Sequence, residues 1–120
     1  MLSLDTHIVV DGLIGDLSVR ELDLLEGVPV AISGIVLWEI SKLVQQKRIS
    51  IDVDGVAFRR FLRQATVYPI TLEIARASTA LDFQSDPADE IIAATSLVEK
   101  IPLITRDRKI LKSKIVPLAI

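Results

Sequence analysis

The stretch VPVAISGIVLWEISKLVQQ, residues 28–46, contains one complete strand-to-helix unit. Its first part, residues 28–32, is a short apolar run rich in β-branched residues, which is typical of a buried strand. Ser33 follows as a good N-cap, and apolar residues then recur at helical spacing up to about Gln46. The stretch therefore predicts a strand that leads directly into an amphipathic helix.

The same alternation of short apolar runs and helical patterns continues in both directions along the chain. SVRE at residues 18–21 forms a capping box, and Gly27 is placed to end the helix that follows. Further helices are expected after caps at Asp54, Thr71 and Asp86, the last with Pro87 at its first position. The expected strands are residues 2–4, 28–32, 67–70, 103–104 and 115–118, and the loops expected to be mobile are residues 11–16 and 47–54. Strands that alternate with helices predict βαβ units and a mostly parallel sheet covered by helices on both faces.

Length and composition are those of one globular domain, which we expect to span residues 1–120. The chain has 120 residues, of which 50% are hydrophobic and 25% are charged, a balance that suits a compact core. It has no cysteine, which excludes disulfides and thiolate metal sites.

Neither a membrane span nor a general polyanion-binding surface is expected. The uncharged stretch at residues 27–38 is shorter than the ~18–20 residues that cross a bilayer, and the first residues do not resemble a secretion signal. We therefore expect a cytoplasmic protein. The formal net charge is -2, so any contact with nucleic acid has to be local or assisted by a metal ion.

Acidic residues follow two of the expected strands and lie near the start of two expected helices. Asp5 comes directly after residues 2–4, and Asp107 comes shortly after residues 103–104. In open parallel sheets the functional site lies beyond the carboxyl ends of the strands, where the strand order reverses. Glu39 and Asp89 belong to the same edge of such a layout, so we expect four carboxylates to converge.

Gathered carboxylates raise one another's pKa unless a positive charge stands between them, and a divalent cation is the simplest such charge. Oxygen ligands suit Mg²⁺ or Mn²⁺, while a single histidine, His7, and the lack of cysteine argue against zinc. A metal ion of this kind activates water and stabilises charge on a phosphodiester. Metal-dependent hydrolysis is the resulting hypothesis.

Each of these acids also has a structural interpretation. Asp5 fits a turn after a strand, and Glu39 fits an i,i+3 pair with Lys42 on a solvated helix face. Asp107 fits the N-cap of a short helix, RKILKS. Asp86, Asp89 and Glu90 fit the positive end of the helix that starts after Asp86. Asp86, assigned to capping, is a weaker candidate ligand than Asp89.

For several other side chains we prefer a structural role over a functional one. His7 lies beside an apolar run and is expected to be packed rather than catalytic. Trp38, Phe58 and Phe61 have helical spacing and are expected in the core, not as platforms for stacking bases.

The four acidic motifs together resemble a PIN domain of the VapC toxin type. The motifs are LDTH at residues 4–7, ISGIVLWEISKL at 32–43, DPADEIIAATSL at 86–97, and LITRDRKIL at 103–111 with IVPLAI at 115–120, so the resemblance covers nearly the whole chain. It implies a three-layer α/β/α sandwich with a mostly parallel central sheet. It also implies a ribonuclease that acts on single-stranded RNA with Mg²⁺ or Mn²⁺, forms homodimers and binds a cognate antitoxin.

The resemblance assigns metal binding and catalysis to Asp5, Glu39, Asp89 and Asp107, with Thr105 as a supporting hydroxyl. The function it implies is a metal-dependent endoribonuclease, the toxin of a type II toxin–antitoxin pair.

Two acids depart from the family pattern. Glu90 stands where relatives usually have arginine or a non-acidic residue, and Asp11 stands where many have an aromatic or apolar one. If Glu90 disturbs the metal, the alternative is a PIN-like binding or regulatory module with weak or no turnover. A phosphatase is suggested by LDTH alone, but His7 occupies the place where that class has its second aspartate.

Overall fold

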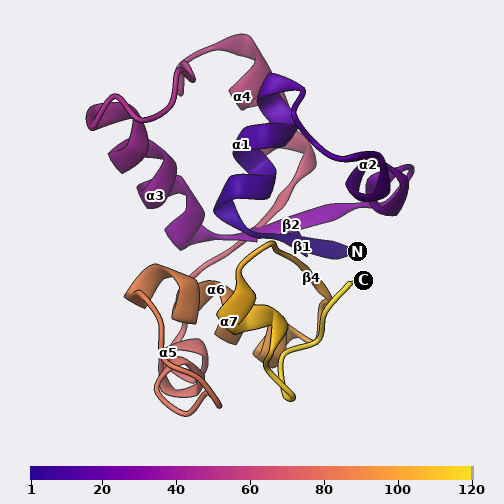
Figure 1. Cartoon of the computed structure of the whole chain (residues 1–120). Helices are drawn as coiled ribbons and strands as arrows, with labels where there is room; N and C mark the ends of the chain where they lie inside the picture. The colour runs from indigo at the N-terminus through magenta and orange to yellow at the C-terminus, as the bar shows by residue number, and fades with distance from the viewer. Residues whose placement is uncertain (120) are drawn as a thin grey trace.

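The computed structural model of the chain describes residues 1–119 and is built around one parallel sheet. Four strands pair in the order β3-β2-β1-β4, and every pairing between them is parallel. Their bounds are β1 (Leu2–Leu4), β2 (Val30–Ser33), β3 (Thr66–Tyr68) and β4 (Leu103–Ile104). The sheet is narrow and its strands are short, so the helices supply most of the mass (Figure 1).

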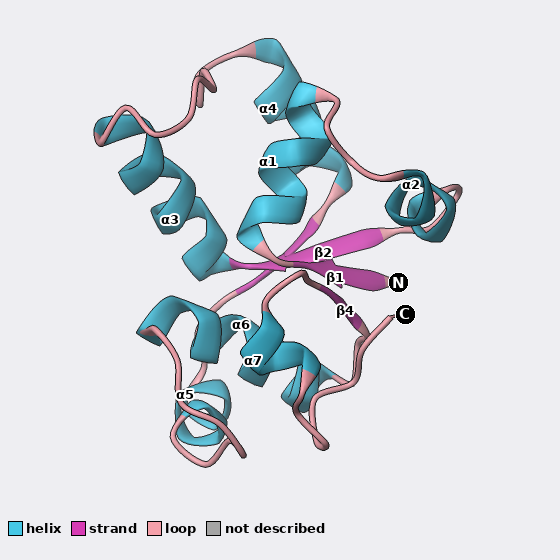
Figure 2. Ribbon diagram, in the orientation of Figure 1, coloured by secondary structure: helices cyan, strands magenta, loops and turns pink. Residues whose placement is uncertain are grey.

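Helices cover both faces of this sheet. Figure 2 shows α1, α2, α3 and α4 on one side and α5, α6 and α7 on the other. Their bounds are α1 (Thr6–Ile14), α2 (Val19–Leu25), α3 (Gly34–Gln45), α4 (Val56–Gln64), α5 (Leu72–Ser78), α6 (Pro87–Glu99) and α7 (Arg108–Leu111). The α/β/α sandwich expected from the sequence is confirmed.

The strand order reverses between β1 and β4. From β1 the chain adds β2 and then β3 on one side, and it then returns on the opposite face to place β4 on the other side of β1. The register pairs Ser3 with Leu103 and Leu4 with Ile104, so β1 and β4 end at the same level. The residues that follow these two strands are therefore neighbours at the edge where open α/β sheets bind ligands.

The core lies on both faces of the central strands. Ala31 and Ile32, adjacent in β2, are both fully buried, as expected for a strand with a helix layer on each side. Residues 92–96 of α6 are all buried. Four of these five are alanine, threonine or serine, and small side chains allow α6 to approach its neighbours α5, α3 and β2 closely.

Three of the N-caps predicted from the sequence, Ser18, Ser33 and Thr71, are confirmed by their side-chain hydrogen bonds. In the capping box the Glu21 amide donates to Ser18 Oγ at 3.1 Å, and the Ser18 amide donates to Glu21 Oε1 at 2.9 Å. Ser33 accepts from the Ile35 amide at 3.3 Å, and Thr71 accepts from the Ile74 amide at 3.2 Å.

Helix α1 was not expected, because residues 11–16 were predicted to form a loop and no helix was assigned after Asp5. The β-branched residues Ile8, Val9 and Val10 have modest helix propensity, but all three are buried in the core. Tertiary packing therefore stabilises a helix that local propensity disfavours. It ends at Gly15, whose φ of 83° is left-handed and suits glycine.

Two further local predictions were wrong. The strand at residues 115–118 is reduced to one bridge between Leu118 and Leu103. Asp54 does not cap α4, because Gly55 occupies the N-cap and the nearby carboxylate of Asp52 accepts from the Asp54 amide at 3.0 Å instead.

Trp38 is exposed, contrary to the prediction that it lies in the core. Its exposed fraction is 55%, and Lys42 Nζ lies 5.8 Å from its ring centroid. Phe58 is buried as expected, and its ring centroid lies 6.4 Å from that of the partly buried Phe61. None of the helices within residues 1–119 is long and apolar enough to cross a membrane.

Truncation of a side chain in α6 should destabilise the fold strongly. Ile92 is fully buried, so Ile92→Ala is expected to lower the free energy of unfolding by about 2–5 kcal/mol through lost burial and a residual cavity. Leu72→Ala is a suitable control because 67% of Leu72 is exposed, and its effect should stay within about 0.5 kcal/mol. Urea unfolding monitored by circular dichroism measures both, and equal effects would contradict the described packing of α6.

Candidate metal centre

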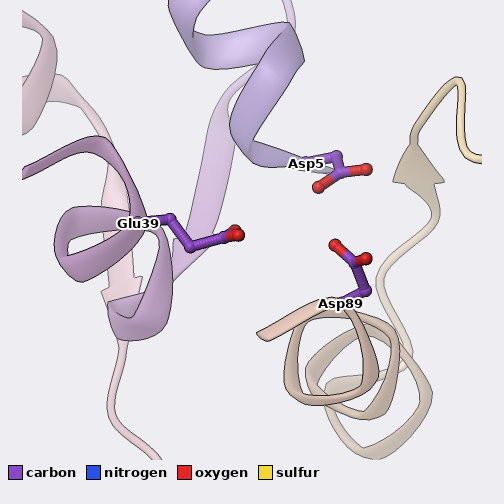
Figure 3. A group of neighbouring side chains, drawn as sticks. All are labelled: Asp5, Glu39 and Asp89. Atoms are coloured by element: carbon purple, nitrogen blue, oxygen red, sulfur yellow. The ribbon is translucent and has the colours of Figure 1, made fainter. Parts of the chain in front are cut away.

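Three carboxylates from distant parts of the chain meet at the carboxyl edge of the sheet. Asp5, Glu39 and Asp89 each offer one oxygen, and these oxygens all lie within 4.8 Å of one another (Figure 3). Asp5 follows β1, Glu39 lies in the second turn of α3, and Asp89 lies in the first turn of α6. The sequence prediction that these three residues converge agrees with the structure.

Asp5 is the most buried of the three, with an exposed fraction of 4%. Its Oδ1 accepts a hydrogen bond from the Thr6 amide at 2.7 Å, and its Oδ2 accepts from the Thr105 hydroxyl at 2.6 Å. The first contact makes Asp5 the N-cap of α1, so Asp5 begins a helix instead of a simple turn, and it is also a member of the group of three acids. The second contact follows from the register of β1 and β4, and it gives Thr105 the supporting position expected from the sequence.

Glu39 faces the other two acids and does not pair with Lys42. It accepts a hydrogen bond from the Thr6 hydroxyl, while Lys42 Nζ lies 3.5 Å from Gln45 Oε1 and faces the ring of Trp38. Burial raises the pKa of Glu39, the hydrogen bond from Thr6 opposes that rise, and the charge of Asp5 adds to it. The interpretation of Glu39 as part of a solvated ion pair is therefore wrong.

The crowding of the acids changes the pKa of Asp89 most clearly. Its pKa is raised to about 6, first by burial and then by the negative charges of Asp5, Glu39 and Asp107. The Ser85 hydroxyl donates to Asp89 Oδ2 at 3.2 Å and partly offsets the rise. A carboxyl group with this pKa lies in a place that favours an added positive charge.

Asp107 lies beside the three converging acids. Its Oδ1 accepts hydrogen bonds from the Lys109 and Ile110 amides at 2.8 and 3.1 Å, which makes Asp107 the N-cap of α7. It nevertheless lines the same pocket, which has a volume of about 250 Å³, and its charge contributes to the raised pKa of Asp89. The expected gathering of four acids thus becomes three in close contact and a fourth at the rim.

Asp86 and Glu90 lie outside the group of three. Asp86 occupies the predicted N-cap position of α6, but its side chain makes no capping hydrogen bond. Glu90 Oε2 accepts from the Ser85 amide at 3.2 Å, so its carboxylate is engaged at the start of α6. The Glu90 carboxylate, which was expected to disturb the metal, is therefore bonded to the backbone outside the group of three acids.

Two residues at the site were not identified from the sequence. Thr6 joins Glu39 to α1 through its hydroxyl, and its position directly after Asp5 was the available signal. His7 lines the pocket and is exposed, whereas we expected it to be packed. Recognition of α1 as a helix would have corrected this, because Ile8, Val9 and Val10 take its buried face.

Arg106 forms an ion-pair network at the rim of the pocket. Its Nε donates to Glu21 Oε2 at 2.8 Å, its Nη2 donates to Glu21 Oε1 at 2.7 Å, and its Nη1 donates to Asp11 Oδ2. The hydrogen bond from Arg106 lowers the pKa of Glu21 to about 2. Asp11 is thus one partner of Arg106.

The donor set fits a hard divalent cation. Within residues 1–119 the ion pairs involve Arg106, Asp11 and Glu21, and none of them neutralises Asp5, Glu39 or Asp89. Neither histidine nor cysteine is part of the group, which leaves carboxylate oxygens, the ligands preferred by Mg²⁺ and Mn²⁺. The geometry and the raised pKa of Asp89 both indicate that this group is suited to hold a metal ion.

Sequence comparison places the chain in a family. The sequence model of the PIN domain matches residues 2–114. The chain belongs to the PIN domain family. A curated relative, Ribonuclease VapC22 of Mycobacterium tuberculosis, is 30% identical over 84 residues, which cover 68% of this chain and 65% of the relative. The match thus spans slightly less than two thirds of that relative's length.

Solved structures share the fold over nearly the whole chain. A toxin-antitoxin complex from Klebsiella pneumoniae contains a chain with a TM-score of 0.71 and 25% identity, covering 99% of this PIN domain protein and 97% of that chain. VapBC2 from Rickettsia felis, bound to a DNA fragment from their promoter, gives a TM-score of 0.76 at 21% identity, with coverage of 98% and 96%. FitAcB from Neisseria gonorrhoeae gives 0.68 at 19% identity, also with coverage of 98% and 96%. The last two support the fold, and the resemblance to PIN domains inferred from the sequence is confirmed.

The raised pKa of Asp89 predicts how the metal-free protein responds to pH. Because the folded-state pKa of about 6 exceeds the usual value near 4, this carboxyl group favours folding below about pH 4, and the benefit is lost as the pH rises through about 6. In a chelator at about pH 7.5, Asp89→Asn should therefore be more stable than the wild type by about 1 kcal/mol, a figure reduced for partial solvent screening.

Urea unfolding at several pH values measures this difference, which should shrink toward about pH 4. Asp23→Asn, a change at an exposed acid of α2, is the control and should show no such trend. A constant difference between Asp89→Asn and the wild type across this range would contradict the assigned electrostatics.

Proposed function

We propose that this protein is a metal-dependent endoribonuclease of the VapC type, acting as the toxin of a toxin–antitoxin pair, with residues 1–120 forming one PIN domain. The observation that carries the proposal is the meeting of Asp5, Glu39 and Asp89 within 4.8 Å at the point where the strand order reverses. The sequence similarity to a ribonuclease and the structural similarity to a toxin–antitoxin complex support the same activity.

The three carboxylates bind Mg²⁺ or Mn²⁺ in this proposal, and Asp107 adds negative charge at the rim. When bound, such an ion lowers the pKa of a water molecule and neutralises charge on the scissile phosphate. The chain holds the ligands in place beforehand: Thr105 fixes Asp5, Thr6 fixes Glu39, and Ser85 fixes one oxygen of Asp89. Asp107 Oδ1 is used in capping α7, so its other oxygen would be the one available to accept a hydrogen bond from the attacking water.

The proposed partners are an RNA substrate, a cognate antitoxin and a second copy of the chain. The structural similarity to a chain of a toxin-antitoxin complex supports an antitoxin as a partner. The exposed apolar side chains of Trp38 and Ile70 are consistent with surface that a second copy covers. Sedimentation analysis of the purified chain tests the dimer directly.

A PIN-like module without turnover is the second candidate. It was motivated by Glu90, whose extra charge was expected to disturb metal binding. The structure weakens that ground, because the Ser85 amide engages Glu90 and the metal-ligand group consists of other residues.

Cleavage of RNA should require both the metal and its ligands. Purified protein with Mg²⁺ or Mn²⁺ should cut single-stranded RNA, and Asp89→Asn should reduce the rate by at least about a hundredfold, the upper range seen when even an outer partner of a metal ligand is lost. Asp23→Asn is the matched control and should cut normally. Gel analysis of labelled RNA measures the rate, and an Asp89→Asn variant as active as the wild type would overturn the catalytic assignment.

Metal binding and RNA cleavage, measured together, distinguish the two candidate functions. Calorimetric binding of Mn²⁺ without cleavage of varied RNAs would favour the module, whereas absence of binding would contradict both candidates.

Loss of the hydroxyl that fixes Asp5 should weaken metal binding without removing a ligand. Thr105→Val retains the shape of the side chain but cannot donate to Asp5 Oδ2, so the Kd for Mn²⁺ should rise by about 10- to 100-fold. Thr66→Val, at an exposed position of the edge strand β3, is the control. An unchanged Kd in Thr105→Val would show that Asp5 does not need this contact.

A further inference from the structure

Arg106 is a positively charged residue beside the proposed metal site. It lines the same pocket as Asp5, Asp89 and Asp107, and it lies between Thr105, which donates to Asp5, and Asp107. It is the one lysine or arginine among the residues that line this pocket.

Two acidic residues, one in α1 and one in α2, accept hydrogen bonds from the Arg106 guanidinium. Glu21 of α2 accepts from Nε and Nη2 at 2.8 and 2.7 Å, which is a two-point contact, and Asp11 of α1 accepts from Nη1. Glu21 is itself fixed, because its Oε1 also accepts from the Ser18 amide at 2.9 Å. The guanidinium is therefore held on two of its edges by groups that belong to the rim.

Without these partners, electrostatic attraction would draw the Arg106 guanidinium toward the three carboxylates of the group. Arginine forms its most favourable pairs with carboxylates, and the acids at the site lack a neutralising partner within residues 1–119. A guanidinium among the acids would compete with the metal ion.

We propose that Asp11 and Glu21 are positioning residues that hold Arg106 at the rim and thereby keep Asp5, Glu39 and Asp89 open to a divalent cation. The inference rests on the proposed metal site. It also gives a role to Asp11, which lies outside the group of three acids.

Mn²⁺ binding to the purified full-length chain, measured by calorimetry, tests this role. The double variant Asp11→Asn with Glu21→Gln should bind Mn²⁺ on the order of tenfold more weakly, because the released guanidinium competes for the acids. Addition of Arg106→Gln to this double variant should restore the Kd to within about twofold of the wild-type value. Recovery on removing the arginine, without a gain of the same size when Arg106→Gln is made in the wild-type background, is the result that neither a purely structural network nor the bare loss of a positive charge would give.

A pair of single changes tests the same idea with both acids retained. Lysine cannot form the two-point contact with Glu21, so Arg106→Lys should weaken Mn²⁺ binding, while Arg106→Gln, which has no positive charge, should not. Ser18→Ala is the control for α2, because it removes one capping contact and leaves the partners of Arg106 in place. Circular dichroism establishes that each variant is folded.

The possible failures are distinguishable. If the wild type binds no Mn²⁺, the metal site itself is wrong and this inference falls with it. If the wild type binds and the double variant binds equally well, or if the triple variant does not recover, then Asp11 and Glu21 do not restrain Arg106 as proposed and the metal site stands.

Discussion

The buried carboxylate of Asp5 is the constraint on which the rest of the site depends. A carboxylate that is 4% exposed is costly unless hydrogen bonds replace its lost hydration. The two donors that do so are the Thr6 amide at the start of α1 and the Thr105 hydroxyl after β4. Asp5 can therefore be buried in this place because β1 and β4 are neighbours in register, and that adjacency results from the reversal of strand order.

The fold places three acids of the site where helices tolerate negative charge. Asp5 caps α1, Asp89 lies in the first turn of α6, and Asp107 caps α7, so each lies at the positive end of a helix dipole. This arrangement compensates only partly, since the pKa values of Glu39 and Asp89 remain raised. A bound cation would offset this mutual repulsion, as expected for a site built for function rather than for stability.

Positive and negative charge are kept apart within one pocket. The Arg106 network with Asp11 and Glu21 is satisfied at the rim, and the group of three acids beside it is not. The network also connects α1, α2 and the loop after β4, the loop that carries Thr105 and Asp107. The same loop thus contributes the hydroxyl that fixes Asp5 and the cation that is held away from it.

The sequence by itself determined the βα alternation, most helix caps, the family, and the identity of the acids at one edge of the sheet, because periodicity and capping are local properties of the chain. Tertiary structure alone decided that α1 is helical, that Trp38 is exposed, and that Asp107 stays at the rim while Asp5, Glu39 and Asp89 meet. Contacts such as those between Thr6 and Glu39, 33 residues apart, or Asp5 and Thr105, 100 residues apart, depend on strand register and helix packing. Local sequence patterns do not encode those distances, because they arise only when separate elements pack against each other.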